Sequence, residues 1–126
     1  MADEKKPVVL LAEDDTTLRN LARTVLEGHG YTVIEAVDGQ EAIDKLRLYQ
    51  DRIQLLIVDV VMPKKNGKEV YEEAQRITPG LKALFASGYP ADIIQKKGIL
   101  EEGIKFVSKP IAPQDLLRKV REVLDE

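Results

Sequence analysis

The sequence predicts an α/β fold in which helices cover both faces of a parallel β-sheet. Short apolar runs rich in β-branched and aliphatic residues alternate with stretches in which apolar residues recur at helical spacing. The predicted strands are almost continuously apolar, as in LLIV at 55–58, which is typical of parallel strands buried on both faces. The length of 126 residues suits a single domain built around one sheet.

Five strands and five helices are expected to alternate along the chain. The strands are predicted at 8–12, 31–36, 54–58, 82–86 and 104–107. The first helix is expected to begin at a Thr16 cap and to end near Gly28 or Gly30. Its apolar face follows the spacing i, i+3, i+4, i+7 and i+8 and consists of Leu18, Leu21, Ala22, Val25 and Leu26. Three further helices are predicted at about 39–49, 67–77 and 91–97, and a last helix is indicated by an apolar face of Leu116, Leu117, Val120, Val123 and Leu124.

This alternation favours a doubly wound, three-layer sandwich, because strand–helix–strand crossovers in a parallel sheet are right-handed. For five strands the leading arrangement is the flavodoxin-like order 2-1-3-4-5, with its switch point between the first and third strands. Residues 1–7 are polar and end in proline, so they are expected to form a tail or the remnant of a linker. Residues 8–126 are expected to form the domain.

Composition excludes several classes of function. The chain has no cysteine, which rules out disulfides, thiolate metal sites and cysteine nucleophiles. Its formal net charge is -3 and its basic residues are dispersed, so nucleic acid is not an expected direct partner. No apolar run is long enough to insert into a membrane, and the amino terminus lacks the apolar centre of a signal peptide. A cytoplasmic protein is therefore expected.

Reactive side chains fall at the ends of four predicted strands. Glu13 and Asp14 follow the first strand, Asp59 the third, Ser87 the fourth and Lys109 the fifth. Ligands of open parallel sheets bind just beyond the carboxyl ends of the strands. In the predicted order the first and third strands are neighbours, so their carboxylates should converge, with the serine and the lysine approaching from the next two strands.

Crowded carboxylates repel one another unless a cation neutralises them. Oxygen ligands without cysteine or clustered histidine favour a hard ion such as Mg²⁺. Asp59 stands alone at a strand end and is the better candidate for a nucleophile toward phosphorus, while Glu13 and Asp14 would serve the metal. Lys109 would neutralise a phosphate oxygen, and the Ser87 hydroxyl could donate a hydrogen bond to another.

Four motifs carry a strong resemblance to a known family: VVLLAEDD at 8–15, LLIVDVVMPKKNG at 55–67, ASGYP at 86–90 and FVSKP at 106–110. In combination they resemble the response-regulator receiver domains of two-component signalling, of the kind found in chemotaxis regulators. The match runs from about Val8 to Leu124. The ASGYP segment is similar to receivers attached to hybrid sensor histidine kinases, and the chain could be a stand-alone receiver or a piece of such a larger protein.

The resemblance implies a role for each matching residue. Glu13 and Asp14 would be the acidic pair, Asp59 the phosphoacceptor, Ser87 the switch hydroxyl and Lys109 the phosphate-sensing lysine. The resemblance further implies that the main-chain carbonyl of Val61 is a metal ligand and that Phe106 is the switch aromatic. Receivers use Mg²⁺ and take the phosphoryl group from a sensor histidine kinase or a histidine phosphotransfer protein. They promote this transfer and their own dephosphorylation without being conventional enzymes, and their partner surface is formed by helix 4, strand 5 and helix 5.

Three features depart from the pattern common in the family. Glu13 stands where aspartate is common, and its longer side chain favours a water-mediated role at the metal. Phe106 lacks the hydroxyl of the tyrosine that many relatives carry. Val61 and Tyr89 are bulky at positions that flank the path of hydrolytic water, so a slow loss of the phosphoryl group is expected.

Other interpretations remain open on the residues alone. The acidic run EDD at 13–15 could simply favour the start of the first helix, and Asp59, Ser87 and Lys109 could each belong to an ordinary turn. A flavin carrier would share the fold, but its first loop should offer glycines and hydroxyls to phosphate rather than EDD. A phosphatase with an aspartyl-phosphate intermediate and a pseudo-receiver that only binds partners are the remaining alternatives.

Overall fold

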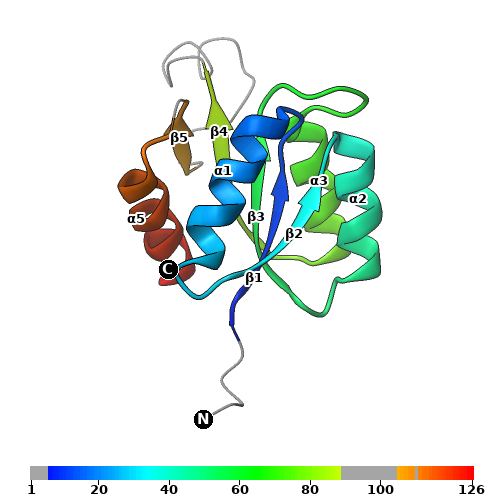
Figure 1. The fold of residues 1–126 in the computed structure, drawn as a ribbon. Coiled ribbons are helices and arrows are strands. Elements are labelled where there is room, and N and C mark those ends of the chain that lie inside the picture. Colours follow the sequence, from blue (N-terminus) through cyan, green and yellow to red (C-terminus); the bar gives the residue numbers. More distant parts are fainter. Residues whose placement is uncertain (1–5, 89–104, 110) are drawn as a thin grey trace.

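The computed structural model describes residues 6–88, 105–109 and 111–126 and contains one parallel sheet flanked by helices (Figure 1). Its elements, in chain order, are β1 (Val8–Ala12), α1 (Thr16–Glu27), β2 (Thr32–Ala36), α2 (Gly39–Leu48), β3 (Ile53–Asp59), α3 (Gly67–Ile77), β4 (Lys82–Ser87), β5 (Phe106–Ser108) and α5 (Pro113–Leu124). The helix expected at 91–97 lies outside the described residues.

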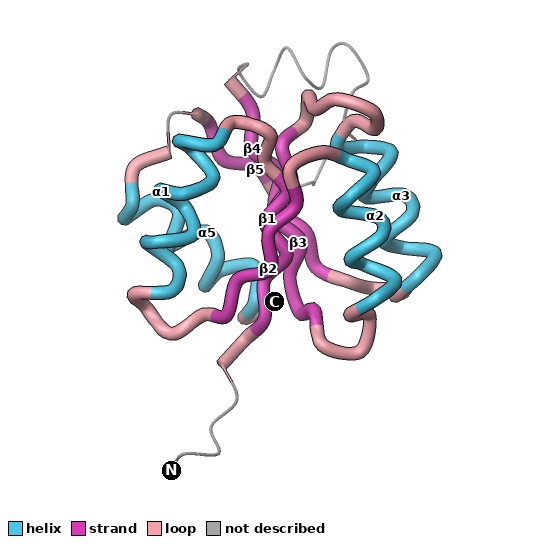
Figure 2. The backbone as a smooth tube through the Cα atoms, turned by 45° about the vertical axis from the view of Figure 1, so that its right-hand side comes forward, coloured by secondary structure: helices cyan, strands magenta, loops and turns pink. Residues whose placement is uncertain are grey.

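The sheet has the order β2-β1-β3-β4-β5, and each neighbouring pair is parallel. Figure 2 shows the sheet nearly edge-on, with α1 and α5 on one face and α2 and α3 on the other. The predicted three-layer α/β sandwich and the predicted strand order are therefore confirmed.

Each face of the sheet carries its own apolar core. Leu10 and Leu56 face the side of α2 and α3, whereas Val9 and Leu55 face the side of α1 and α5. Successive side chains of a strand point to opposite faces, so a strand covered on both faces must be apolar at nearly every position. This explains the unbroken run LLIV at 55–58. On the side of α2 and α3, Tyr71 packs edge-on against Phe85, with 5.5 Å between the ring centres.

The start of α1 differs from the prediction. The helix begins at Thr16, but its N-cap is Asp15, whose Oδ1 accepts a hydrogen bond of 3.0 Å from the Leu18 amide. A carboxylate at this position reaches the free amide of the third helical residue, so the cap lies one residue earlier than expected. The interpretation of the acidic run as a helix start is thus correct for its last member.

The apolar face of α1 is also less buried than its spacing suggests. Only Leu26 is fully buried among the described residues of this helix, and Leu21 is 50% exposed. An apolar cavity of about 70 Å³ is lined by residues of α1, the sheet and α5, and Leu21 is one of them. The predicted face is therefore apolar but only partly buried.

The strands β3, β4 and β5 each end one residue later than predicted, and in β3 and β4 the added residue is a reactive one. β3 ends at Asp59 and β4 ends at Ser87. Both residues therefore lie in regular sheet structure and not in a loop. Both side chains are also buried. Within the described part of the chain, no helix is both long enough and apolar enough to cross a membrane.

Asp38 caps α2 through a hydrogen bond of 2.8 Å from the Glu41 amide, and this bond lowers the pKa of Asp38. Replacing Asp38 by alanine should lower the free energy of unfolding at pH 7 by about 1 kcal/mol. Because the folded-state pKa is lowered, the contribution of the ionised carboxylate is present above about pH 4 and is lost at lower pH. Urea unfolding at several pH values tests this, and a difference between the two proteins that grows on acidification would contradict it.

Candidate functional site

The predicted site residues meet at the carboxyl edge of the sheet, which is uppermost in Figure 1. Glu13 and Asp14 directly follow β1, Asp59 ends β3, Ser87 ends β4 and Lys109 directly follows β5. The strand register explains why these ends coincide. Ala12 pairs with Val58, Asp59 with Ala86, and Ser87 with Ser108, so the four strands stop at nearly the same height.

Lys109 forms the centre of the site. Its Nζ lies 2.5 Å from Glu13 Oε1 and 2.8 Å from Asp59 Oδ2, and all three side chains are at most 15% exposed. The Lys109 amide also donates a hydrogen bond of 2.7 Å to the carbonyl of Ser87, which fixes the base of the lysine against β4. One partly buried cation thus faces two buried carboxylates.

The environment shifts the pKa values of two of these groups. Burial raises the pKa of Glu13 above its ordinary value, although hydrogen bonds from Lys109 and the Asp15 amide act in the opposite direction. Burial alone would lower the pKa of Lys109, but its hydrogen bonds to Asp59 and Glu13 outweigh this effect and raise it. Lys109 is therefore protonated at neutral pH and supplies a fixed positive charge.

The carboxylates form a cluster that fits a hard divalent cation. Glu13, Asp14 and Asp59 each offer one oxygen, and these oxygens lie within 4.8 Å of one another. Asp14 is exposed while Glu13 and Asp59 are buried, so the cluster opens to solvent on one side. A small all-oxygen set with solvent access suits Mg²⁺, which keeps several of its waters. The donor chemistry therefore agrees with the predicted metal.

Main-chain groups of the loop after β3 hold the Asp59 side chain and the backbone around it. The Val61 amide donates a hydrogen bond of 3.3 Å to Asp59 Oδ1, and the Val60 amide donates one of 2.9 Å to the Ala86 carbonyl. The chain then returns so that the Gly67 amide donates to the Val60 carbonyl at 2.9 Å. The main chain of Val61 is thus at the site, while its side chain is 58% exposed.

The remaining predicted residues lie beside this cluster. Ser87 is 1% exposed at the end of β4. Phe106 pairs in register with Phe85 on β4 and packs, half-buried, against the core on the side of α2 and α3. Tyr89 and Pro110 lie outside the described residues.

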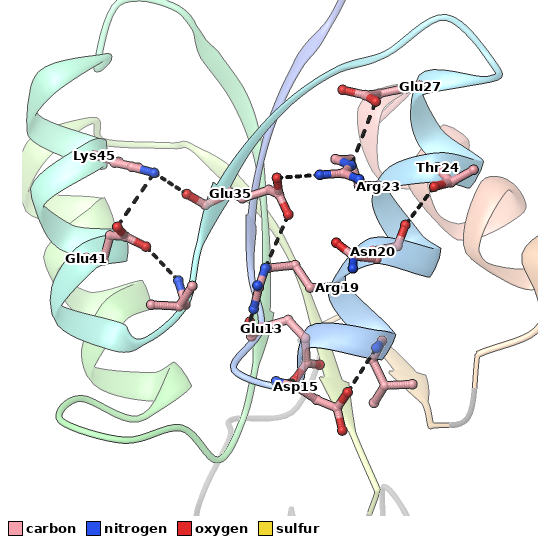
Figure 3. Close-up of polar contacts among 12 residues, drawn as sticks. Glu13, Asp15, Arg19, Asn20, Arg23, Thr24, Glu27, Glu35, Glu41 and Lys45 are labelled. Carbon is pink, nitrogen blue, oxygen red and sulfur yellow. Dashed lines mark hydrogen bonds and ion pairs between the residues drawn. The ribbon is translucent and has the colours of Figure 1, made fainter.

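Two residues that support the acidic cluster, Arg19 and Glu35, were not predicted from the sequence. The Arg19 guanidinium donates a hydrogen bond of 2.9 Å to the Glu13 carbonyl and another of 3.2 Å to Glu35 Oε1. Figure 3 shows Arg19 reaching from α1 to both groups. A sequence signal existed, because Arg19 is a long basic residue one turn into the helix that directly follows the acidic run. Its partner on β2 could not be identified from the sequence.

Comparison with known proteins gives one consistent result. The family described as "Response regulator receiver domain" matches residues 9–121. The chain is 34% identical over 116 residues to the response regulator receiver protein CpdR of Brucella abortus, covering 92% of this chain and 95% of CpdR. It is 31% identical over 118 residues to the sensor kinase CckA of the same organism, covering 94% of this chain but 12% of the kinase. The chain thus spans a small fraction of that kinase.

The solved structures show the same fold. A CheY-like response regulator receiver domain protein from Methanospirillum hungatei aligns with a TM-score of 0.81 at 27% identity, covering 96% of this chain and 95% of that chain. The receiver domain of the hybrid histidine kinase CckA aligns with a TM-score of 0.79 at 32% identity, covering 93% of this chain and 98% of that chain.

Gly67 is packed directly against the main chain of Asp59. A Cβ atom at position 67 would lie 2.5 Å from the Asp59 carbonyl oxygen and 3.0 Å from the Val60 Cα. Both neighbours are backbone atoms, one at the end of β3 and one directly after it, and they cannot rotate away. Gly67→Ala should therefore lower the free energy of unfolding by about 1–3 kcal/mol, measured by urea denaturation.

The adjacent, exposed Lys68 provides a matched control, because Lys68→Ala also adds an alanine to the first turn of α3. Its effect should stay within about 0.5 kcal/mol. Equal losses in the two variants would show that the close approach at Gly67 does not constrain the site.

Proposed function

The chain belongs to the response regulator receiver domain family, and on this premise we propose that it accepts a phosphoryl group on Asp59 in a Mg²⁺-dependent reaction. The observation that supports this most strongly is the bridge from Lys109 to Asp59 and Glu13 inside a three-carboxylate cluster. Members of this family are typically phosphoacceptors rather than conventional enzymes. Their role in two-component signalling implies a histidine kinase as partner.

In the proposed transfer, an Asp59 carboxylate oxygen attacks the phosphorus of a phosphohistidine. A new P–O bond forms, the P–N bond breaks, and its electron pair stays on the imidazole nitrogen. The donor would be a sensor histidine kinase or a histidine phosphotransfer protein. The product is an acyl phosphate on Asp59, and the chain acts on its own side chain.

The surrounding residues would act mainly through charge and position. Lys109 is already held at Asp59, so its ammonium group can neutralise an oxygen of the transferred group without a large movement. Mg²⁺, held by Glu13, Asp14, Asp59 and the Val61 carbonyl, would supply the remaining positive charge for the transfer. Because Asp59 is buried at a strand end, its carboxylate is held in one orientation and the attack needs little reorganisation.

Phosphorylation would be sensed at Ser87 and Phe106. Ser87 ends β4, the strand beside β3, and its hydroxyl is the switch candidate there. Phe106 lies on the next strand and packs on the side of α2 and α3, where a rotation of its ring would alter the surface of β5. We further propose that the surface formed by β5, α5 and the segment at 91–97 binds the output partner. We also propose that the chain works in the cytoplasm.

Incubation with Mg²⁺ and acetyl phosphate should add one phosphoryl group, detected by intact mass measurement. The labelling should disappear in Asp59→Asn and when Mg²⁺ is removed. Asp51→Asn is a matched control, because it makes the same change at an exposed acid outside the cluster and should leave labelling intact.

Persistent labelling of Asp59→Asn would move the acceptor to another residue. Absence of labelling in the wild type would favour the pseudo-receiver interpretation, in which the fold only binds partners.

A further inference from the structure

Arg19 joins the acidic cluster to the far edge of the sheet. It lies on α1, and its guanidinium group contacts the main chain of Glu13 and the side chain of Glu35 on β2 (Figure 3). Its side chain is 12% exposed. A nearly buried arginine must have its donors satisfied, so these two contacts determine where the guanidinium lies.

The main chain of Glu13 is held at both ends. Its amide donates a hydrogen bond of 3.0 Å to the Ala36 carbonyl at the end of β2, and its carbonyl accepts the bond of 2.9 Å from Arg19. Its side chain is held as well, because Glu13 Oε2 accepts a bond of 3.0 Å from the Asp15 amide. Glu13 is thus fixed by β2, by α1 and by the turn between β1 and α1.

Glu35 is in turn anchored by neighbours on two helices. Its carboxylate pairs with Arg19 at 3.2 Å and with Arg23 at 2.9 Å, both on α1. Its carbonyl accepts a hydrogen bond from Lys45 on α2. A planar guanidinium that donates through two different nitrogens to two fixed acceptors has a defined orientation. Through these two contacts, Arg19 fixes the main chain of Glu13 relative to Glu35 on β2.

We propose that Arg19 is a positioning residue for the metal site, and that it keeps the carboxylate of Glu13 directed toward Asp59. This inference rests on the proposed function, since it assumes that the cluster binds Mg²⁺. It adds a role for Glu35, which orients Arg19. It also assigns a role to a partly buried cation that does not contact Asp59.

The direction in which Mg²⁺ affinity changes when Arg19 is replaced distinguishes a positioning role from a purely electrostatic one. A fixed positive charge near a metal site repels the metal ion, so loss of charge alone would strengthen Mg²⁺ binding. Loss of a residue that orients a ligand weakens metal binding, typically by 10-fold or more. The two interpretations therefore predict opposite changes in the dissociation constant.

The test compares Arg19→Gln with Arg23→Gln. Both variants lose one positive charge and one ion pair to Glu35, but only Arg19 reaches Glu13. Calorimetric titration with Mg²⁺ should show a dissociation constant raised roughly 10-fold in Arg19→Gln and little changed in Arg23→Gln. The rate of Asp59 labelling by acetyl phosphate in Arg19→Gln should recover at saturating Mg²⁺, which a general folding defect would not allow.

A readout without metal follows from the same contacts. In the Mg²⁺-free protein, hydrogen exchange of the Asp15 amide, which is bonded to Glu13 Oε2, should be faster in Arg19→Gln than in Arg23→Gln. If Arg19→Gln is too unstable to titrate, Glu35→Gln retains Arg19 but weakens its anchor and should raise the dissociation constant in the same direction.

The outcomes are distinguishable. Mg²⁺ binding in Arg19→Gln as tight as or tighter than in the wild type would overturn the positioning role and leave the proposed function intact. Failure of the wild type to bind Mg²⁺ would overturn the proposed function itself, and the positioning role with it.

Discussion

The balance of charge at the carboxyl edge of the sheet is the constraint on which the other features depend. Glu13 and Asp59 are buried carboxylates on neighbouring strand ends, and two such groups cannot both remain ionised without a cation between them. Lys109 is that cation and contacts both. Removing one partner of a buried ionic group typically costs several kcal/mol, so the three side chains form one unit. Asp14 adds a further negative charge that a divalent metal ion would offset.

The topology of the sheet brings these charged side chains together. Parallel strands in the order β2-β1-β3-β4-β5 put the acidic strand ends in the middle of the sheet and the lysine at its side. The register, the close approach of Gly67 to Asp59 and the hold of Arg19 on Glu13 each limit how far the cluster can relax. A rigid edge of this kind keeps opposing charges close before any ligand arrives, which lowers the reorganisation that a reaction requires.

The sequence predicted the features that depend on pattern and on topology. Alternating apolar segments were sufficient for the strand order, and the placement of Glu13, Asp59, Ser87 and Lys109 at strand ends was sufficient to bring them together. The sequence did not predict the features that depend on how far individual side chains extend. The cap at Asp15, the exposure of Leu21 and the contacts of Arg19 depend on distances between elements that periodicity does not contain. The bridge from Lys109 to Glu13 was missed for the same reason, because the lysine was expected to face a phosphate oxygen.

The dependence of folding stability on Mg²⁺ in Lys109→Met gives the sharpest test of this charge balance. A metal ion that binds the folded state stabilises it in proportion to the logarithm of its concentration over its dissociation constant. If Lys109 and Mg²⁺ neutralise the same carboxylates, removal of the lysine should increase the gain in unfolding free energy produced by Mg²⁺ relative to the wild type. An equal or smaller gain in Lys109→Met would contradict the view that the cluster is held together by shared positive charge.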